Sequence, residues 1–152
     1  CYHNYYPLGR ASVGNLIPKP TMLGDVLCDH IRELEGKLTV YSYRVPTQSV
    51  CAADISIILS RTITQENLHE ALEELKGCRD FKGRPIISFN DEPLVSCDFT
   101  ANSASSVIDM RWTKITQGRF LKIVLWYDNE WGYSNRVVDA LCKIDSLAKT
   151  SA

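Results

Sequence analysis

Residues 122–144 read KIVLWYDNEWGYSNRVVDALCKI, and this stretch decides the fold class. Its first part, Ile123 to Tyr127, is β-branched and aromatic, which is typical of a buried strand. The polar run 128–130 ends that strand, Gly132 allows the backbone to bend, and Ser134 is a candidate helix cap. We therefore predict a strand, a tight polar turn and a helix, in that order.

The predicted helix has one apolar face, because hydrophobic residues recur at helical spacing: Val137, Val138, Leu141 and Ile144. The carboxylate and amide side chains of residues 128–130 then lie at the carboxyl end of the preceding strand. Sites in strand-rich α/β architectures often lie at such ends. This strand–helix junction is therefore the first place to look for function.

The rest of the chain mixes helical and strand patterns. We predict helices over 21–34 and 64–76, each with a threonine (Thr21, Thr64) as N-cap and a glycine at its end. Strands are predicted over 37–45, 49–59, 86–89, 94–99, 106–110 and 120–127, with the first two as antiparallel neighbours. Because the strands cluster instead of alternating strictly with helices, the fold class is α+β, with a mostly antiparallel or mixed sheet and about three helices.

Length, charge and hydropathy exclude several classes. A chain of 152 residues is one ordinary domain or a domain with a short arm. We expect an irregular arm over 1–20, an α+β domain over 21–147 and a disordered tail over 148–152. The formal net charge of −1 is mixed along the chain, so no basic stripe indicates nucleic acid or anionic lipid. No apolar run approaches the roughly 20 residues that span a bilayer.

Six cysteines are present, at positions 1, 28, 51, 78, 97 and 142. None forms a C-x-x-C pair, and their spacing predicts no zinc site. We interpret them as buried or half-buried free thiols in the cytoplasm or another reducing compartment, with a disulfide pair as the alternative. Redox sensing is a further hypothesis, based on Cys78 beside Arg79.

The run WYDNEWGYSNRVVDAL (126–141) resembles the near-terminal signature of phosphorylating glyceraldehyde-3-phosphate dehydrogenases and the related erythrose-4-phosphate dehydrogenases. The resemblance continues in order through NLIPKPT (15–21), LEGKLTVYSYRVPT (34–47) and LVSCDFTANSASSVID (94–109). It covers nearly the whole chain, but only the C-terminal, catalytic half of that family. It implies the fold of that half and a place in an NAD-dependent oxidoreductase family of glycolysis.

The resemblance also implies four inherited site residues. Thr21 and Arg44 match family positions that hold a phosphoryl group, for which the planar fork of arginine is suited. Asn129 matches the asparagine that bonds the nicotinamide carboxamide, and Tyr133 the tyrosine beside the nicotinamide ring. The alternatives are structural: a strand-edge salt bridge for Arg44, a turn that bonds its own backbone for Asn129, and simple packing for Tyr133.

The phosphate positions depart from the family pattern. Met22 stands where the family has a glycine, and Asp25 where it has a lysine. A negative charge at Asp25 disfavours phosphate, so we expect a degraded pocket, although Arg10 could contribute from the arm.

The family's catalytic parts do not occur within these 152 residues. There is no Gly-rich dinucleotide motif, and no cysteine lies in a Ser-Cys-Thr-Thr-Asn run, where the family has its nucleophile. His3 is the one N-terminal candidate for the family's base, but it lies too close to Asn15. We therefore assign no catalytic residue.

We predict that this chain by itself is a structural or interaction module, without enzymatic activity and without need of a cofactor. We expect it to bind a protein partner or a second copy through its sheet face. No nucleic-acid or membrane partner is expected. Exposed Trp112 and Trp131 would favour such a module, because tryptophan is enriched at interface hot spots. The alternative is a fragment or split half of an NAD-dependent aldehyde-phosphate dehydrogenase, active when joined to an NAD-binding half.

Overall fold

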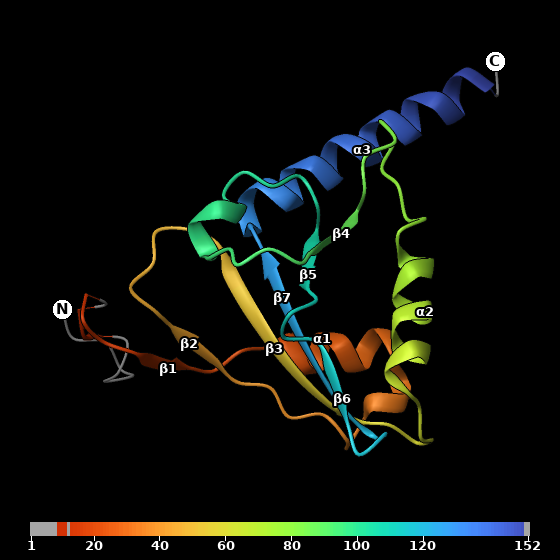
Figure 1. The fold of residues 1–152 in the computed structure, drawn as a ribbon. Coiled ribbons are helices and arrows are strands. Elements are labelled where there is room, and N and C mark those ends of the chain that lie inside the picture. The colour runs from red at the N-terminus through yellow and green to blue at the C-terminus, as the bar shows by residue number, and fades with distance from the viewer. Residues whose placement is uncertain (1–8, 12, 151–152) are drawn as a thin grey trace. The chain divides into compact units, whose positions relative to one another are not determined.

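The computed structural model describes residues 9–11 and 13–150, and the chain forms two compact units (Figure 1). The first, the N-terminal unit, ends at Gln48, and the second, the sheet unit, begins at Ser49. The boundaries expected at residues 20 and 147 do not coincide with this division.

The N-terminal unit is built on a short antiparallel strand pair. Strand β1 (Ile17–Lys19) pairs with β2 (Ser42–Arg44), and Ile17 is buried. Between them in the chain lie helix α1 (Leu23–His30) and the 3-10 turn η2 (Arg32–Leu34). The helix predicted over 21–34 is thus an eight-residue α-helix followed by a 3-10 turn, and the strand predicted over 37–45 is only three residues long.

Thr21 does not cap α1 as predicted. The cap position is Met22, and no side chain caps the helix there. The hydroxyl of Thr21 instead accepts a hydrogen bond from the backbone N–H of Leu23 at 3.2 Å, which is a local turn contact.

The sheet unit contains a mixed sheet, which confirms the α+β class. Its strands run in the order β3 (Cys51–Ile58), β7 (Phe120–Tyr127), β5 (Ser106–Asp109) and β4 (Ile87–Asn90), and β6 (Lys114–Thr116) also pairs with β7. The β4–β5 pair is parallel and the others are antiparallel. The three-residue strands β1 and β6 escaped prediction because such short segments carry almost no periodicity.

The predicted pairing of strands 37–45 and 49–59 is wrong. Strand β2 pairs with β1, whereas β3 pairs with β7 over its full eight residues. The link between β2 and β3 contains Pro46 and Val50, and Val50 has a φ of 67°. This backbone is not that of a tight hairpin, and pairing with β7 satisfies many more backbone groups.

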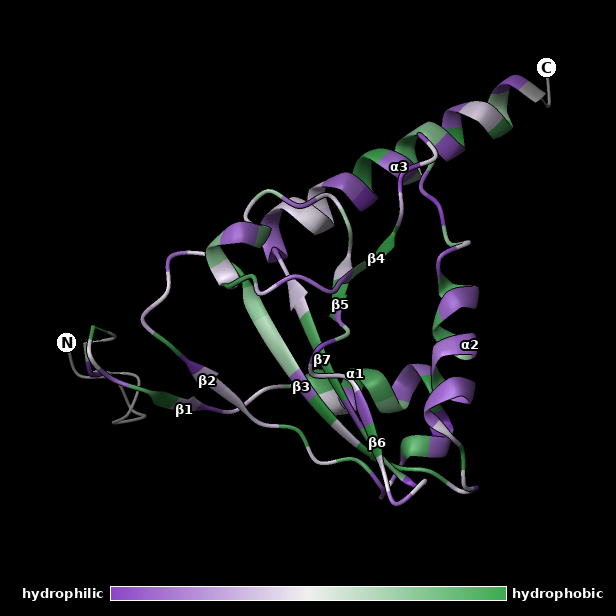
Figure 2. Cartoon of the chain, viewed as in Figure 1, coloured by the Kyte–Doolittle hydropathy of each residue, from purple (hydrophilic) through white to green (hydrophobic). Residues whose placement is uncertain are grey.

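One core cluster lies between helix α2 (Gln65–Leu75) and the sheet. Leu68 and Leu72 of α2 pack with Ile108 and Leu121. Thr64 caps α2 as predicted, because its hydroxyl accepts from the N–H of Asn67 while the Asn67 side chain accepts from the N–H of Thr64. Figure 2 shows the contrast between the largely hydrophilic α2 and the hydrophobic residues along β3.

A second cluster contains Val50, Phe99, Ala104 and Val107, and the Phe99 ring stacks on Trp126 at a centroid distance of 5.4 Å. The strand predicted over 94–99 is wrong, because Ser96–Phe99 form the 3-10 turn η3. The carboxylate of Asp98 accepts from the backbone N–H of Val95 at 2.8 Å. This local bond competes with strand pairing and explains the turn.

Helix α3 (Asn129–Thr150) follows β7 with only Asp128 between them. The predicted turn over 128–130 is therefore wrong, and so is the cap at Ser134, whose hydroxyl donates to the carbonyl of Glu130 within the helix at 2.6 Å. Residues 148–150, expected in a disordered tail, are helical. Gly132 is also helical and buried; a Cβ there would lie 3.1 Å from the carbonyl oxygen of Ala104, so its role is close approach and not a bend.

Candidate functional site

The junction between β7 and α3 presents two of the four predicted site residues together. Asn129 is the first residue of α3, and Tyr133 lies one turn later. Residues four positions apart lie on the same face of a helix. Asn129 is exposed, and the side chain of Tyr133 is 73 % exposed, so both are available to a ligand.

Cys51 fixes the side chain of Asn129. Cys51 is the first residue of β3 and lies opposite Tyr127 in the β3–β7 register. Its sulfur accepts a hydrogen bond from the Asn129 amide Nδ2 at 3.2 Å. Sequence reasoning missed Cys51 because 78 positions separate the two residues, and only the strand register brings them together.

Asp128 sets the start of the helix that carries the site. Its side chain is buried, with Oδ1 accepting from the N–H of Trp131 and Oδ2 from the N–H of Ala101, both at 2.9 Å. These backbone hydrogen bonds hold the pKa of Asp128 below its usual value, although burial opposes the shift. Asp128 is therefore the cap that sequence analysis placed at Ser134.

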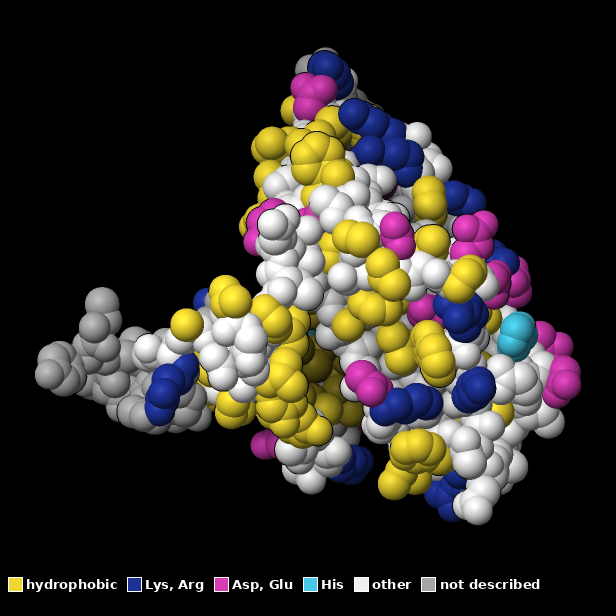
Figure 3. All heavy atoms as spheres, turned by 60° about the vertical axis from the view of Figure 1, so that its left-hand side comes forward, with side chains coloured by type: hydrophobic (Ala, Val, Ile, Leu, Met, Phe, Trp, Pro, Cys, Tyr) yellow, Lys and Arg dark blue, Asp and Glu magenta, His cyan; other side chains and the backbone are white. Residues whose placement is uncertain are grey.

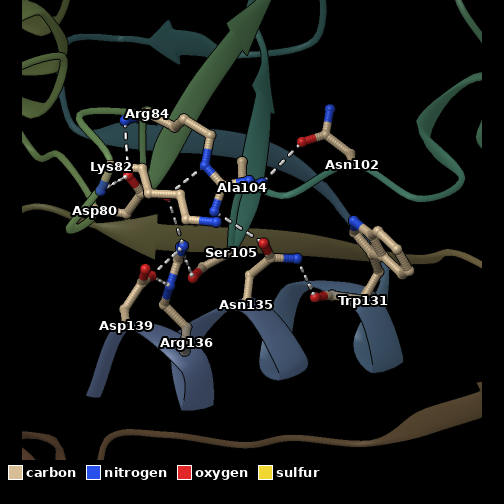
Figure 4. Close-up of polar contacts among 10 residues, drawn as sticks. All are labelled: Asp80, Lys82, Arg84, Asn102, Ala104, Ser105, Trp131, Asn135, Arg136 and Asp139. Atoms are coloured by element: carbon tan, nitrogen blue, oxygen red, sulfur yellow. Dashed lines mark hydrogen bonds and ion pairs between the residues drawn. The ribbon is translucent and has the colours of Figure 1, made fainter. Parts of the chain in front are cut away.

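A polar clasp, defined here as Asp80, Arg84, Asn135, Arg136 and Asp139, holds the middle of α3 (Figure 4). Nε of Arg84 donates to Asp80 at 2.6 Å, and its Nη2 donates to Asn135 at 2.9 Å. Nη2 of Arg136 lies 2.7 Å from Asp139 and 3.5 Å from Asp80. Both arginines are engaged with carboxylates, so the clasp is a structural contact between α3 and the loop that precedes β4.

Asp80 is the buried centre of this clasp. Burial alone would raise the pKa of its carboxyl, but hydrogen bonds from the backbone and side chain of Arg84, another from the backbone of Lys82, and the charge of Arg84 hold it below its usual value. Asp80 is therefore ionised at neutral pH and pairs with the cations beside it.

The two predicted phosphate residues both lie in the N-terminal unit, but not in one hollow. A depression of about 760 Å³ is lined by Thr21 with Asp25, Asp29, Glu35 and Arg32, and Arg44 is not among its lining residues. Arg44 lies exposed on β2, opposite Ile17. Three carboxylates against one guanidinium make the depression unfavourable for a phosphate.

The remaining sequence predictions have mixed outcomes. Trp112 and Trp131 are exposed, at 55 % and 50 %. The five cysteines that the structure describes are free thiols, while His3 and Cys1 lie outside the described residues. Across residues 9–11 and 13–150, no group of three His, Cys, Asp or Glu side chains is placed to hold a metal. Within the same ranges no helix has the length and apolarity to cross a membrane.

Two features of the described residues are compatible with the predicted contact between Asn129 and a nicotinamide. The carboxamide of Asn129 is exposed, and no residue in the described part of the chain donates to its Oδ1. The Tyr133 ring lies on the same helix face and offers a flat, uncovered surface. An amide acceptor beside an aromatic ring suits a planar ring that carries a carboxamide.

Comparison with known proteins gives one consistent result. The family model described as glyceraldehyde 3-phosphate dehydrogenase, C-terminal domain, matches residues 1–129. A cytosolic glyceraldehyde-3-phosphate dehydrogenase of Chlamydomonas reinhardtii is 41 % identical over 86 % of this chain, and a glyceraldehyde-3-phosphate dehydrogenase of Mastigamoeba balamuthi is 41 % identical over 91 %. Glyceraldehyde-3-phosphate dehydrogenase 2 of Staphylococcus aureus (strain Mu50 / ATCC 700699) is 40 % identical over 91 %.

The chain spans 38 %, 40 % and 39 % of the length of these three relatives, respectively. The matched residues include both candidate regions, the N-terminal unit with Thr21 and Arg44 and the β7–α3 junction up to Asn129. The chain belongs to the glyceraldehyde-3-phosphate dehydrogenase family and corresponds to the C-terminal domain of its members.

Proposed function

We propose that this chain supplies the C-terminal domain of an NAD-dependent, phosphorylating aldehyde-phosphate dehydrogenase. On its own it has no dehydrogenase activity, and it acts when joined to a dinucleotide-binding half. The observation that carries the proposal is the β7–α3 junction, where Asn129 and Tyr133 are exposed on one helix face and Asn129 is held by Cys51. The relatives that share about two-fifths identity with the chain are named glyceraldehyde-3-phosphate dehydrogenases, which supports the same reaction.

The residues of this chain then have defined roles. Oδ1 of Asn129 would accept a hydrogen bond from the carboxamide N–H of the nicotinamide and so orient that ring. Tyr133 would pack beside the ring and shield it from water. Asp128 holds the first turn of α3, and with it Asn129, in a constant position. NAD, when bound, supplies the hydride acceptor for oxidation of the aldehyde.

The test is NADH formation, followed at 340 nm, from glyceraldehyde 3-phosphate, inorganic phosphate and NAD. The protein is used as purified from its source, together with any dinucleotide-binding half. We expect activity, and we expect Asn129→Ala to lower kcat/KM for NAD by about tenfold or more, as loss of an orienting hydrogen bond implies. Asp145→Ala, at an exposed position of the same helix, should leave the rate unchanged. An inactive wild-type protein would contradict the proposal.

A second candidate is an interaction module without chemistry, favoured by uncovered surfaces. One face of α3 exposes apolar side chains, at 46 % for Val138, 61 % for Leu141 and 63 % for Ile144. Figure 3 shows hydrophobic side chains along α3 at the top of the view. The exposed face of β3 and β7 carries an Asp54–Lys122 ion pair at its centre.

For this module we propose a second copy on the sheet face, because a face with both charges of an ion pair can complement itself across a two-fold axis. Sedimentation should then show a dimer that Lys122→Glu weakens and Lys149→Glu does not.

In an interaction module the inherited phosphate positions, Thr21 and Arg44, should not bind phosphate. Inorganic phosphate should therefore not raise the melting temperature of the wild-type protein. A rise that Arg44→Ala abolishes would instead show that the pocket still binds phosphate.

For either function we propose a reducing, cytoplasmic environment. The five described cysteines are free, which suits such a compartment, and the Chlamydomonas relative is named cytosolic.

A further inference from the structure

We infer that Cys51 is a positioning residue that sets the orientation of the Asn129 carboxamide, and thereby makes the site select a nicotinamide carboxamide over rings that lack its N–H. This inference rests on the proposed dehydrogenase function. The amide of Asn129 can present either its oxygen, which accepts hydrogen bonds, or its nitrogen, which donates them, to a ligand. The inference concerns which of the two faces the ligand.

The orientation follows from one hydrogen bond. Nδ2 of Asn129 donates to the sulfur of Cys51 at 3.2 Å. Since the nitrogen is used in this way, the oxygen of the amide points away from the thiol. No group within residues 9–11 and 13–150 donates to that oxygen, and Asn129 is exposed. The site therefore presents an acceptor to an incoming ring.

Both partners of this bond are rigidly placed. Cys51 is held by the β3–β7 pairing and follows Val50, which is buried in the second core cluster with a φ of 67°. A β-branched residue in this left-handed conformation is strained, and it persists only where its surroundings fix it. On the other side, Asp128 fixes the first turn of α3 through the N–H groups of Trp131 and Ala101.

The residue directly across the strand pair from Cys51 is also neutral. Tyr127 is directly opposite Cys51 in the β3–β7 register. Burial, followed by the proximity of Cys51, raises the pKa of Tyr127, so the phenol stays neutral at physiological pH. The residue that faces Cys51 across the strand pair is therefore uncharged and does not compete ionically for the Asn129 amide.

An acceptor at Asn129 has a chemical consequence for ligand choice. The carboxamide of nicotinamide carries an N–H that can donate to Oδ1. The methyl ketone of 3-acetylpyridine has the same shape but no N–H, so it would leave the acceptor unpaired. Without Cys51 the amide is free to turn its Nδ2 toward the ketone oxygen. Discrimination between the two cofactors should therefore depend on Cys51.

The kinetic test uses the assembled enzyme as purified from its source. The ratio of kcat/KM for NAD to that for 3-acetylpyridine adenine dinucleotide is compared among wild type, Cys51→Ser and Cys51→Ala. We expect Cys51→Ala to lower this ratio between about twofold and tenfold, the change that one neutral hydrogen bond corresponds to. Cys51→Ser should keep it, because a hydroxyl also accepts from Nδ2. Cys97→Ala, an exposed thiol elsewhere in the sheet unit, is the control.

A second readout needs no turnover. In a ¹⁵N-labelled protein, the two side-chain amide protons of Asn129 should exchange with water faster and shift in Cys51→Ala, and should resemble wild type in Cys51→Ser and Cys97→Ala. An unchanged Asn129 amide or an unchanged cofactor ratio in Cys51→Ala would overturn the inference and leave the proposed function intact. A wild-type enzyme that does not reduce NAD would overturn both.

Discussion

The substitution Asp128→Ala removes the residue that joins the sheet to the helix carrying the candidate site. The Asp128 side chain is 7 % exposed and accepts two backbone hydrogen bonds, from Trp131 at the start of α3 and from Ala101 in the loop after η3. Alanine cannot replace either bond. The change therefore uncaps a helix and leaves a loop N–H without its partner.

The expected loss of stability follows from these two bonds. Loss of an N-cap costs about 1 kcal/mol, and a partly buried N–H without an acceptor costs about 1–3 kcal/mol. We therefore expect Asp128→Ala to lower the free energy of unfolding by about 2–4 kcal/mol. Asp128→Asn should lower it less, by about 1–3 kcal/mol, because its single amide oxygen can still accept one of the two bonds.

Urea unfolding at pH 7, followed by far-UV circular dichroism, measures this difference. The matched control is Asp145→Ala, which removes an exposed carboxylate from the same helix, where its i,i+4 pair with Lys149 is worth about 0.3–0.5 kcal/mol. If Asp128→Ala is no more destabilising than Asp145→Ala, the capping role assigned to Asp128 is wrong.

The difference in stability between wild type and Asp128→Ala depends on pH. The pKa of Asp128 is lowered in the folded protein from a usual value of 3.8, chiefly by the hydrogen bonds from Trp131 and Ala101. Its stabilisation is therefore fully present above that usual value and is lost as pH falls through the lower folded pKa. The stability gap between wild type and Asp128→Ala should narrow as the pH falls below 3.8, and a gap that widens there would contradict the assignment.

Two further predictions concern the fold. Gly118→Ala should lower the free energy of unfolding by more than the roughly 1–2 kcal/mol that a left-handed alanine costs, because the φ of Gly118 is 67° and a Cβ would collide with Thr62. The control is Gly83→Ala, with a φ of 77° and open space around it, which should show only the conformational cost in the same urea assay. Leu72→Ala should cost about 2–5 kcal/mol, because Leu72 is buried in the α2 cluster, whereas Leu147→Ala, exposed on α3, should change the urea midpoint little.

The elements with strong local patterns were predicted well. The β-branched run of β7 and the capping box with apolar spacing of α2 lie where the sequence places them. The start of α3 was misplaced by several residues, because Asp128 caps the helix directly after the strand and no loop intervenes. Segment 94–99 has the hydrophobicity of a strand, yet the bond from Val95 to the Asp98 carboxylate makes it turn.

The candidate site was predictable only in part. Asn129 and Tyr133 share one local motif, so their placement on one helix face follows from sequence spacing. Cys51 lies on a strand whose partner was predicted wrongly, and a one-residue change in register would turn its thiol to the other face of the sheet. For Thr21 and Arg44, the resemblance predicts one shared phosphate site. The depression that Thr21 lines does not include Arg44.

The central claim is that this chain works with a dinucleotide-binding half. Native mass spectrometry of the untagged protein from its source, followed by NADH formation at 340 nm on the same sample, tests it most directly. We predict a species that contains a dinucleotide-binding half with a cysteine nucleophile and that reduces NAD with glyceraldehyde 3-phosphate. A homo-oligomer of these 152 residues alone, without NAD reduction, would contradict the claim and favour the interaction module.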